Sequence, residues 1–389
     1  MRKLILLLVA NMAISAGAKQ IFIAPYGSDA NNGTITSPLQ TIGEAVKKIS
    51  SGDTIYLRGG LYQCEKLVKI AINSGSELHR TLLSAYPGDK RPVLDFSATA
   101  SLGKPGITFA ADYWHVYGFD VTHAGHNGIR IVGGSHNIFE YLSTFDNGNA
   151  GFQLAKGAAD NIIKNCDSYY NADAKNEDAD GFAPKLDVGS DNHFIGCRAW
   201  MNSDDGYDGY LRGEDRDVNT YYENCIAYKN GYLKDGTRSK GDGNGFKLGG
   251  CNDEAMRRHN STLTDCISAD NWLKGYDRNS TVGSMTLTGC IACRNGVNSN
   301  SYNYGFQKGK VVSLAPGKVL TIKNCISLRG KDLKLDTTPN DITGNSWQRS
   351  DFHPSDYDQF HPEILIGKRQ SDGSLPAEVL RLMKEKVIR

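Results

Sequence analysis

A frame that recurs six times is the feature of this 389-residue sequence that most constrains its fold. In each copy a short apolar run ends in a variable residue, then asparagine, glycine or aspartate, then cysteine, and successive copies lie 24 to 41 residues apart. The cysteines are Cys166, Cys197, Cys225, Cys266, Cys290 and Cys325. Self-similarity at such a spacing, with insertions of variable length, is typical of a solenoid.

Two further columns of residues keep the same period. Five residues after each of the first five cysteines stands an asparagine, at Asn171, Asn202, Asn230, Asn271 and Asn295, and Asn147 continues the column one unit earlier. A glycine followed by an aromatic residue recurs at 151–152, 181–182, 206–207, 245–246, 275–276 and 305–306. Helical solenoids would show a 3.6-residue period, whereas these units contain short β-branched and aromatic runs broken by Asn, Asp and Gly. We therefore expect an all-β parallel β-helix.

In a parallel β-helix, equivalent positions of successive coils stack about 4.8 Å apart. The cysteine column is then predicted to be an interior stack of small apolar side chains rather than a set of disulfides, since free cysteine is among the most buried residue types. The asparagine column is predicted to be a structural ladder at a turn.

The ends of such a solenoid need covers. Residues 41–49 have amphipathic helix spacing before the strand-like residues 54–57, which predicts an N-terminal capping helix. The columns fade after about Arg329, and residues 376–388 predict a terminal helix within a C-terminal cap of helix and loop. No linker is apparent, so residues 19–389 are expected to form one domain, as a monomer.

The first eighteen residues resemble a signal peptide, because Arg2 and Lys3 precede an apolar run and Ala16-Gly17-Ala18 fits a cleavage site. Export to the periplasm or the medium is expected, with Lys19 as the first mature residue. No later segment has the roughly 20 apolar residues of a membrane span. The formal net charge of +1 provides no general basic field for nucleic acid.

Aligning the glycine–aromatic column also aligns acidic residues. Asp180 falls beside Asp205, and Asp208 falls beside Lys247, while Asp204 precedes Asp205. Carboxylates one strand spacing apart raise one another's pKa unless a cation neutralises them. Because calcium takes six to eight oxygen ligands in flexible geometry, we expect these four aspartates to bind Ca²⁺.

Lys247 lies on a strand-like segment beside this predicted ion. A neutral lysine in such a place is a candidate general base. A cation would favour the neutral amine, whereas Asp208 alone would favour the ammonium. The alternative interpretation is a plain salt bridge between Lys247 and Asp208.

These residues are similar to those of the pectate lyases in polysaccharide lyase family 9. The resemblance rests on DADGFAPKL (178–186), NSDDGYD (202–208) and GDGNGFKLG (241–249). It implies a single-stranded right-handed parallel β-helix, calcium bound by Asp180, Asp204, Asp205 and Asp208, and Lys247 as the catalytic base. Tyr207 departs from the tryptophan expected in the second motif, which raises a question about subsite contacts.

The expected activity is calcium-dependent β-elimination on an acidic plant polysaccharide, pectin, with pectate preferred over rhamnogalacturonan I. Two alternatives are a β-helix hydrolase that uses paired aspartates and a calcium-dependent glycan-binding protein without turnover. Candidates for holding further uronate carboxylates are Lys185, Arg212, Arg216, Arg278 and Lys308.

Overall fold

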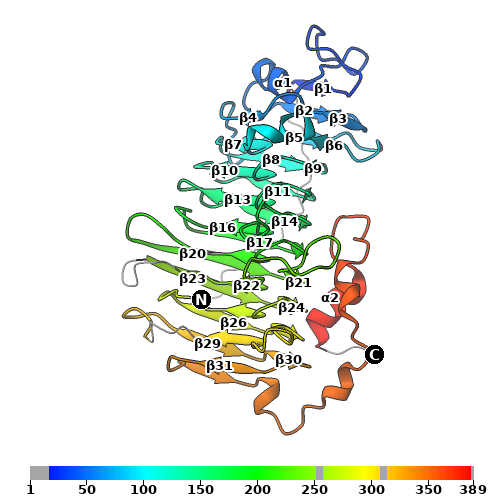
Figure 1. The fold of residues 1–389 in the computed structure, drawn as a ribbon. Helices are drawn as coiled ribbons and strands as arrows, with labels where there is room; N and C mark the ends of the chain where they lie inside the picture. The colour runs from blue at the N-terminus through cyan, green and yellow to red at the C-terminus, as the bar shows by residue number, and fades with distance from the viewer. Residues whose placement is uncertain (1–16, 251–256, 307–312, 387–389) are drawn as a thin grey trace.

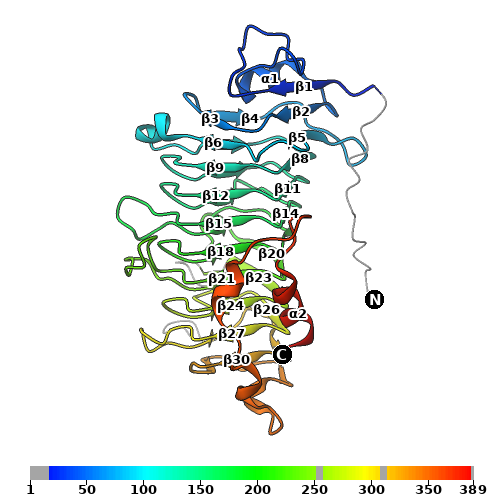
Figure 2. The ribbon, with the colours of Figure 1, turned by 90° about the vertical axis from the view of Figure 1, so that its right-hand side faces the viewer.

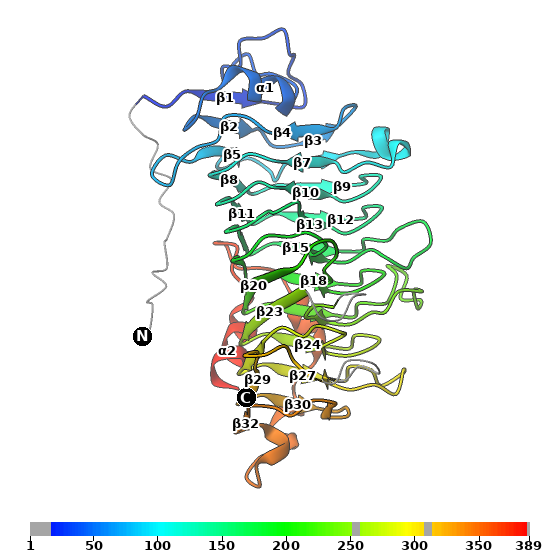
Figure 3. The same ribbon diagram turned by 90° about the vertical axis from the view of Figure 1, so that its left-hand side faces the viewer.

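The computed structural model describes residues 17–250, 257–306 and 313–386, and over these residues the chain winds as a parallel β-helix (Figure 1). Three sheets run along the molecule, and neighbouring strands in each pair in parallel, for example β10 with β13 and β20 with β23. The three sheets stack coil upon coil, as Figure 3 shows from the side that carries β10 and β13. The predicted fold is therefore confirmed.

Sheet A has 12 strands among the described residues: β1 (Gln20–Ile23), β2 (Thr54–Leu57), β5 (Thr81–Ala85), β8 (Trp114–Tyr117), β11 (Ile138–Glu140), β14 (Ile162–Lys164), β17 (Asn192–Ile195), β20 (Arg216–Glu223), β23 (Arg257–Thr264), β26 (Met285–Thr288), β29 (Leu320–Lys323) and β32 (Asp341–Thr343). Sheet B has ten: β4 (Val68–Ile70), β7 (Ile107–Phe109), β10 (Ile129–Val132), β13 (Phe152–Ala155), β16 (Phe182–Pro184), β19 (Tyr207–Asp208), β22 (Phe246–Lys247), β25 (Tyr276–Asp277), β28 (Tyr304–Phe306) and β31 (Leu333–Leu335). Sheet C also has ten: β3 (Leu61–Gln63), β6 (Val93–Asp95), β9 (Asp120–Thr122), β12 (Ser143–Phe145), β15 (Asp167–Tyr169), β18 (Arg198–Trp200), β21 (Ile226–Tyr228), β24 (Ile267–Ala269), β27 (Ile291–Cys293) and β30 (Ile326–Leu328).

The recurring frame marks the bend from sheet A to sheet C. The residue before each of its cysteines has a positive φ between 52° and 65°, at Asn165, Gly196, Asn224, Asp265, Gly289 and Asn324. Glycine, asparagine and aspartate enter this left-handed region more readily than other residues, which explains why only they occupy the position. The six cysteines that follow are fully buried and free of disulfides, as the column predicted.

The aromatic column forms a second interior stack. Phe182, Tyr207 and Phe246 follow one another on sheet B with ring centroids 5.2 Å and 4.5 Å apart, and the stack continues through Tyr276. In the last copy of the column the expected glycine–aromatic pair 305–306 is wrong, because Tyr276 pairs with Tyr304. The buried ring fixes this register, so the glycine before it is not required.

The asparagine ladder is also present. From Asn147 to Asn295, each side-chain amide donates to the Oδ1 atom of the next asparagine, at 2.8 to 3.0 Å, and the ladder ends on Asn303. A second, shorter ladder joins Asn137, Asn161 and Asn192 at another turn. This ladder was not predicted from the sequence, because three asparagines do not stand out as a column.

Both ends of the coil are covered. Helix α1 (Ile42–Lys48) is capped by Thr41, whose hydroxyl accepts a hydrogen bond from the Glu44 amide, and it closes the N-terminal end as expected. The coil extends beyond Arg329 through β31 and β32, one coil further than the columns predicted. The short helical elements are η1 (Ser97–Leu102), η2 (Ser346–Gln348), η3 (Pro354–Tyr357), η4 (Pro362–Ile366) and α2 (Ala377–Glu385).

The C-terminal segment turns back along the outside of sheet C (Figure 2). Its apolar side chains, among them Leu365 and Leu382, pack on Ile226 and Ile267 of that sheet. Asp167 on β15 receives charge-assisted hydrogen bonds from Arg198 and from Arg369, both at 2.7 Å. These contacts fasten the C-terminal cap to the middle of the solenoid.

The predicted signal peptide lies almost wholly outside the described residues, which begin at Gly17. Within the described ranges, no helix is both long enough and apolar enough to cross a membrane.

Candidate active site

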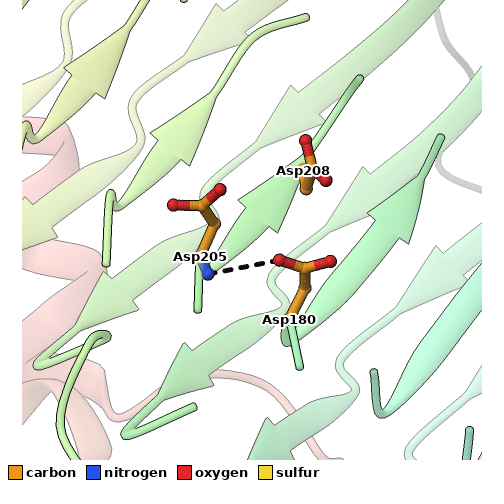
Figure 4. Close-up of side chains that lie close together, drawn as sticks. All are labelled: Asp180, Asp205 and Asp208. Atoms are coloured by element: carbon orange, nitrogen blue, oxygen red, sulfur yellow. Dashed lines mark hydrogen bonds between the residues drawn. The ribbon is translucent and has the colours of Figure 1, made fainter. Parts of the chain in front are cut away.

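The predicted site residues come together on the outer face of sheet B. On β19 and β22 the aromatic residue points into the solenoid and the next residue points out, so that Asp208 pairs in register with Lys247. Asp205 lies in the turn before β19, and its backbone amide donates to Oδ1 of Asp180 at 3.2 Å (Figure 4). The sequence register therefore placed these four residues correctly.

The carboxylates form two overlapping triads. Asp180, Asp205 and Asp208 are all buried and offer oxygens that lie within 4.8 Å of one another. Asp204, Asp205 and Asp242 offer oxygens equally close together, but Asp242 is exposed. Asp205 belongs to both. Asp242 stands within the third family motif but lies off the glycine–aromatic column, so it was not predicted from the sequence.

Two lysines are held by these aspartates. Nζ of Lys247 lies 3.0 Å from Oδ2 of Asp205 and 3.8 Å from Oδ1 of Asp208. Nζ of Lys185 lies 2.6 Å from Oδ2 of Asp180 and 3.0 Å from Oδ2 of Asp208. The nearest partner of Lys247 is thus Asp205 rather than Asp208, and Lys185 belongs to the cluster rather than to a separate carboxylate-binding subsite.

The charges in this cluster do not balance. Burial, reinforced by Asp208 and Asp205, raises the pKa of Asp180 to about 8 although Lys185 opposes it. Burial also raises the pKa of Asp205 to about 6 against the effect of Lys247, and it raises the pKa of Asp204 well above its usual value. More carboxylates are buried here than two ammonium groups stabilise, so an additional cation would relieve their repulsion.

In two other groups of the cluster, the nearby opposite charges outweigh burial. Burial would raise the pKa of Asp208, but Lys247 and Lys185 outweigh it and hold that pKa below its usual value. Burial would lower the pKa of Lys247, but Asp205 and Asp208 outweigh it and raise that pKa well above its usual value. In the absence of a further cation, Lys247 is therefore an ammonium.

One atom in the cluster is specifically suited to a metal. Oδ2 of Asp205 is buried and accepts no hydrogen bond from any group in the described parts of the chain, since its contact with Nζ of Lys247 lacks hydrogen-bond geometry. A buried carboxylate oxygen without a hydrogen bond is costly unless it binds a cation. All the ligands in the two triads are oxygens, which suits calcium and does not suit zinc.

A groove of about 410 Å³ opens over the cluster. It is lined by Asp204, Asp208 and Lys247 from the cluster, and by Tyr210 and Arg212 just beyond β19. Its other lining residues are His126, Arg130, Asn149, Gln153, Asp178, Lys185 and Leu186. The groove runs along the outer face of sheet B and across the carboxylates.

The cationic residues predicted to hold further uronate carboxylates differ in whether they reach the groove. Arg212 lines the groove, with its guanidinium 5.5 Å from the centre of the Tyr210 ring. Arg278 is fully buried in an ion pair with Asp336, so it is not available to a ligand. Arg216 donates to the carbonyl of Val188. Lys308 lies outside the described residues.

Tyr207 does not contact this groove. Its ring is buried in the interior stack, and its hydroxyl donates to the carbonyl oxygen of Cys197 at 2.9 Å. The departure from tryptophan is therefore a change in the core, and it leaves the groove face of β19 unaltered.

Comparisons with known proteins agree with this geometry. The family described as "Pel9A-like, right handed beta helix region" matches residues 21–315. Pectate lyase L of Paenibacillus polymyxa (strain SC2) is 40% identical over 317 residues, which cover 78% of this chain and 68% of that protein. The crystal structure of pectate lyase Pel9A has a TM-score of 0.77 at 31% identity, covering 92% of this chain and 88% of the other. A rhamnogalacturonan lyase also has a TM-score of 0.77, at 25% identity, covering 92% and 95%.

Proposed function

Because the chain belongs to the Pel9A-like family of right-handed β-helix polysaccharide lyases, we propose that it cleaves pectate by β-elimination, with calcium held by the aspartate cluster. The observation that carries this proposal is the register of Asp208 with Lys247 beside a buried, hydrogen-bond-deficient oxygen of Asp205. This arrangement supports a cation site and a base on one wall of an open groove.

Asp180, Asp204, Asp205 and Asp208 would hold the ion. When bound, calcium would supply positive charge that draws electrons from the C6 carboxylate of a galacturonate and offsets the aspartate charges around Lys247. Asp205 and Asp208 otherwise keep the Lys247 amine protonated, so the amine can serve as a base only when their charge is engaged elsewhere.

Lys247 then removes the proton on C5 of the sugar. The electron pair of that C–H bond forms the double bond between C4 and C5, and the bond from C4 to the bridging oxygen breaks with its electrons on the oxygen. That oxygen takes up a proton, and Lys247 later releases the one it gained. The products are a 4,5-unsaturated sugar and a new reducing end.

A second substrate is favoured by one finding. The similarity to a rhamnogalacturonan lyase equals in TM-score the similarity to Pel9A, and the same elimination chemistry serves a backbone in which galacturonate alternates with rhamnose. The hydrolase and the binding protein considered from the sequence receive no such support, since the named relatives are lyases.

The test is ultraviolet absorbance of the conjugated double bond during incubation with polygalacturonate and, separately, with rhamnogalacturonan I. Rising absorbance that requires calcium supports the proposal, and the preferred polymer identifies the substrate. New reducing ends without that absorbance would mean hydrolysis and overturn it.

We also propose that the protein is exported and begins at Lys19, on the signal-peptide pattern of residues 1–18. N-terminal sequencing of the protein recovered from the periplasm or the medium tests this directly. Recovery only in the cytoplasm with Met1 in place would refute it.

A further inference from the structure

Arg130 is a cationic side chain of the groove with no partner in the described parts of the chain. Its residue neighbours on β10, Ile129 and Ile131, are buried in the core, so Arg130 points out of sheet B into the groove. Its Nε atom is buried yet has no hydrogen bond. Lys185 and Lys247, by contrast, are both held by aspartates.

The position of Arg130 is fixed by strand register. Arg130 pairs with Gln153 on β13, and Gln153 pairs with Ala183 on β16; Figure 1 shows β10, β13 and β16 side by side. The next coil carries Asp208, whose partner is Lys247. Arg130 therefore lies three strands before Asp208, roughly 14 Å along the solenoid axis.

The row between Arg130 and the aspartates suits an extended ligand. Ala183 contributes only a methyl group, so no long side chain of this row stands between Gln153 and Asp208. Arg130 and Lys247 line the same groove, which means that one chain of sugars can contact both.

A buried guanidinium nitrogen without a partner costs free energy unless a ligand supplies an acceptor. The planar guanidinium matches a carboxylate with two parallel hydrogen bonds, and no carboxylate of the protein takes this place in the described residues. The proposed substrate carries carboxylates at regular intervals.

We propose that Arg130 binds the carboxylate of a second uronate, several sugars away from the scissile bond on the N-terminal side of the groove. This inference rests on the proposed function, and it deepens it: Arg130 is a specificity residue for unesterified uronate chains long enough to reach β10.

The experiment compares wild type, Arg130→Gln and Arg130→Lys on oligogalacturonates of increasing length. In wild type, kcat/KM rises when the oligomer becomes long enough to reach Arg130. In Arg130→Gln that rise is lost, so long oligomers lose about 10- to 100-fold, mainly through KM, while short ones are unchanged. Arg130→Lys retains part of the gain, because it keeps the charge but not the paired donors.

Two controls separate recognition from structure. Methyl-esterified oligomers, which carry no charge at C6, should be equally poor substrates for wild type and Arg130→Gln at every length. Arg381→Gln, an exposed arginine on α2, should behave as wild type. Because Arg130 has no partner to lose, the melting temperature should stay the same; an equal loss at all lengths would overturn the subsite.

A binding assay keeps this inference distinct from the lyase proposal. Titration of a long oligogalacturonate into the Lys247→Ala protein, with and without Arg130→Gln, should give about 10- to 100-fold weaker binding for the double variant. If wild type makes no unsaturated product but this difference is found, the lyase proposal fails and the subsite stands. If elimination occurs and Arg130→Gln matches wild type at every length, the subsite is wrong and the lyase proposal stands.

Discussion

Replacement of Lys247 by alanine tests the proposed base and, at the same time, the electrostatics of the cluster. In the structure Lys247 is nearly buried, and its Nζ atom lies 3.0 Å from a carboxylate oxygen of Asp205. Loss of a general base typically lowers the rate by about 10²- to 10⁴-fold. We expect elimination by Lys247→Ala to fall by that amount, which corresponds to about 3–5 kcal/mol of transition-state stabilisation.

The same change should affect stability differently with and without calcium. At 3.0 Å the attraction between the two charges is about 5 kcal/mol with an effective dielectric constant of about 20. Removing one partner of a buried pair costs about 3–5 kcal/mol, because the remaining charge is uncompensated. In chelator, Lys247→Ala should therefore be less stable than wild type by that order, whereas bound calcium should remove most of the difference.

Calcium affinity gives the third measurement. Lys247 carries a positive charge beside the proposed ligands, so its removal should leave calcium binding at least as tight as in wild type. A merely structural role for Lys247 would instead weaken binding and activity together.

The assay combines initial rates of unsaturated product, thermal melts in calcium and in chelator, and calorimetric titration of calcium. Lys318→Ala is the matched control, since it removes a lysine paired with Asp217 on sheet A, outside the groove. Lys247→Arg should not restore the rate, because a guanidinium is not deprotonated near neutral pH. Undiminished elimination by Lys247→Ala would refute the assignment of the base.

Three further predictions follow from other parts of the molecule. Calcium at one hundred times its Kd should stabilise wild type by about 2.7 kcal/mol and so raise its melting temperature, as differential scanning calorimetry would record. The same calcium concentration should not raise the melting temperature of Asp205→Asn. Asn202→Ala removes the hydrogen bonds that the side-chain amide donates to Asn230 and to the carbonyl oxygen of Ser168. The free energy of unfolding in urea should fall by about 2–4 kcal/mol, and a loss below about 0.5 kcal/mol would contradict a structural ladder. Burial acts to raise the pKa of Asp167, but Arg369 and Arg198 outweigh burial and lower that pKa. The stability that Asp167 contributes is therefore complete above the pKa of about 3.9 that it has in the unfolded chain, and it is lost as the pH falls below that value. Asp167→Asn should be less stable than wild type at neutral pH and should lack this part of the acid sensitivity, which pH-dependent melts would measure.

Much of the fold could be predicted because a solenoid repeats its constraints. In the six coils that carry the cysteine column, an asparagine, glycine or aspartate with positive φ occupies the bend, and a buried cysteine follows it in the interior. These constraints recur at equivalent positions, so they appear in the sequence as columns. The same columns aligned Asp208 with Lys247, since residues that share a register position in neighbouring coils are neighbours in space.

The errors and omissions arose where no column existed. Tyr304 occupies the last position that the glycine–aromatic column predicts, and no glycine precedes it, because ring stacking rather than glycine sets the register there. Asp242 and Lys185 lie off the column and reach the cluster only through the path of the turns around β16 and β22.

The sequence by itself therefore determined the coil, its interior stacks and the proximity of the four aspartates to Lys247, because all of these depend on periodic position. Only the tertiary structure decided which charges are paired and which are free. Lys185 and Arg278 look like available cations in the sequence, yet one bridges Asp180 and Asp208 and the other is buried against Asp336. Arg130 has no such neighbour in the described residues. Whether a charged side chain has a partner depends on other side chains that approach it from distant coils and loops. The spacing of residues along the sequence does not give those distances.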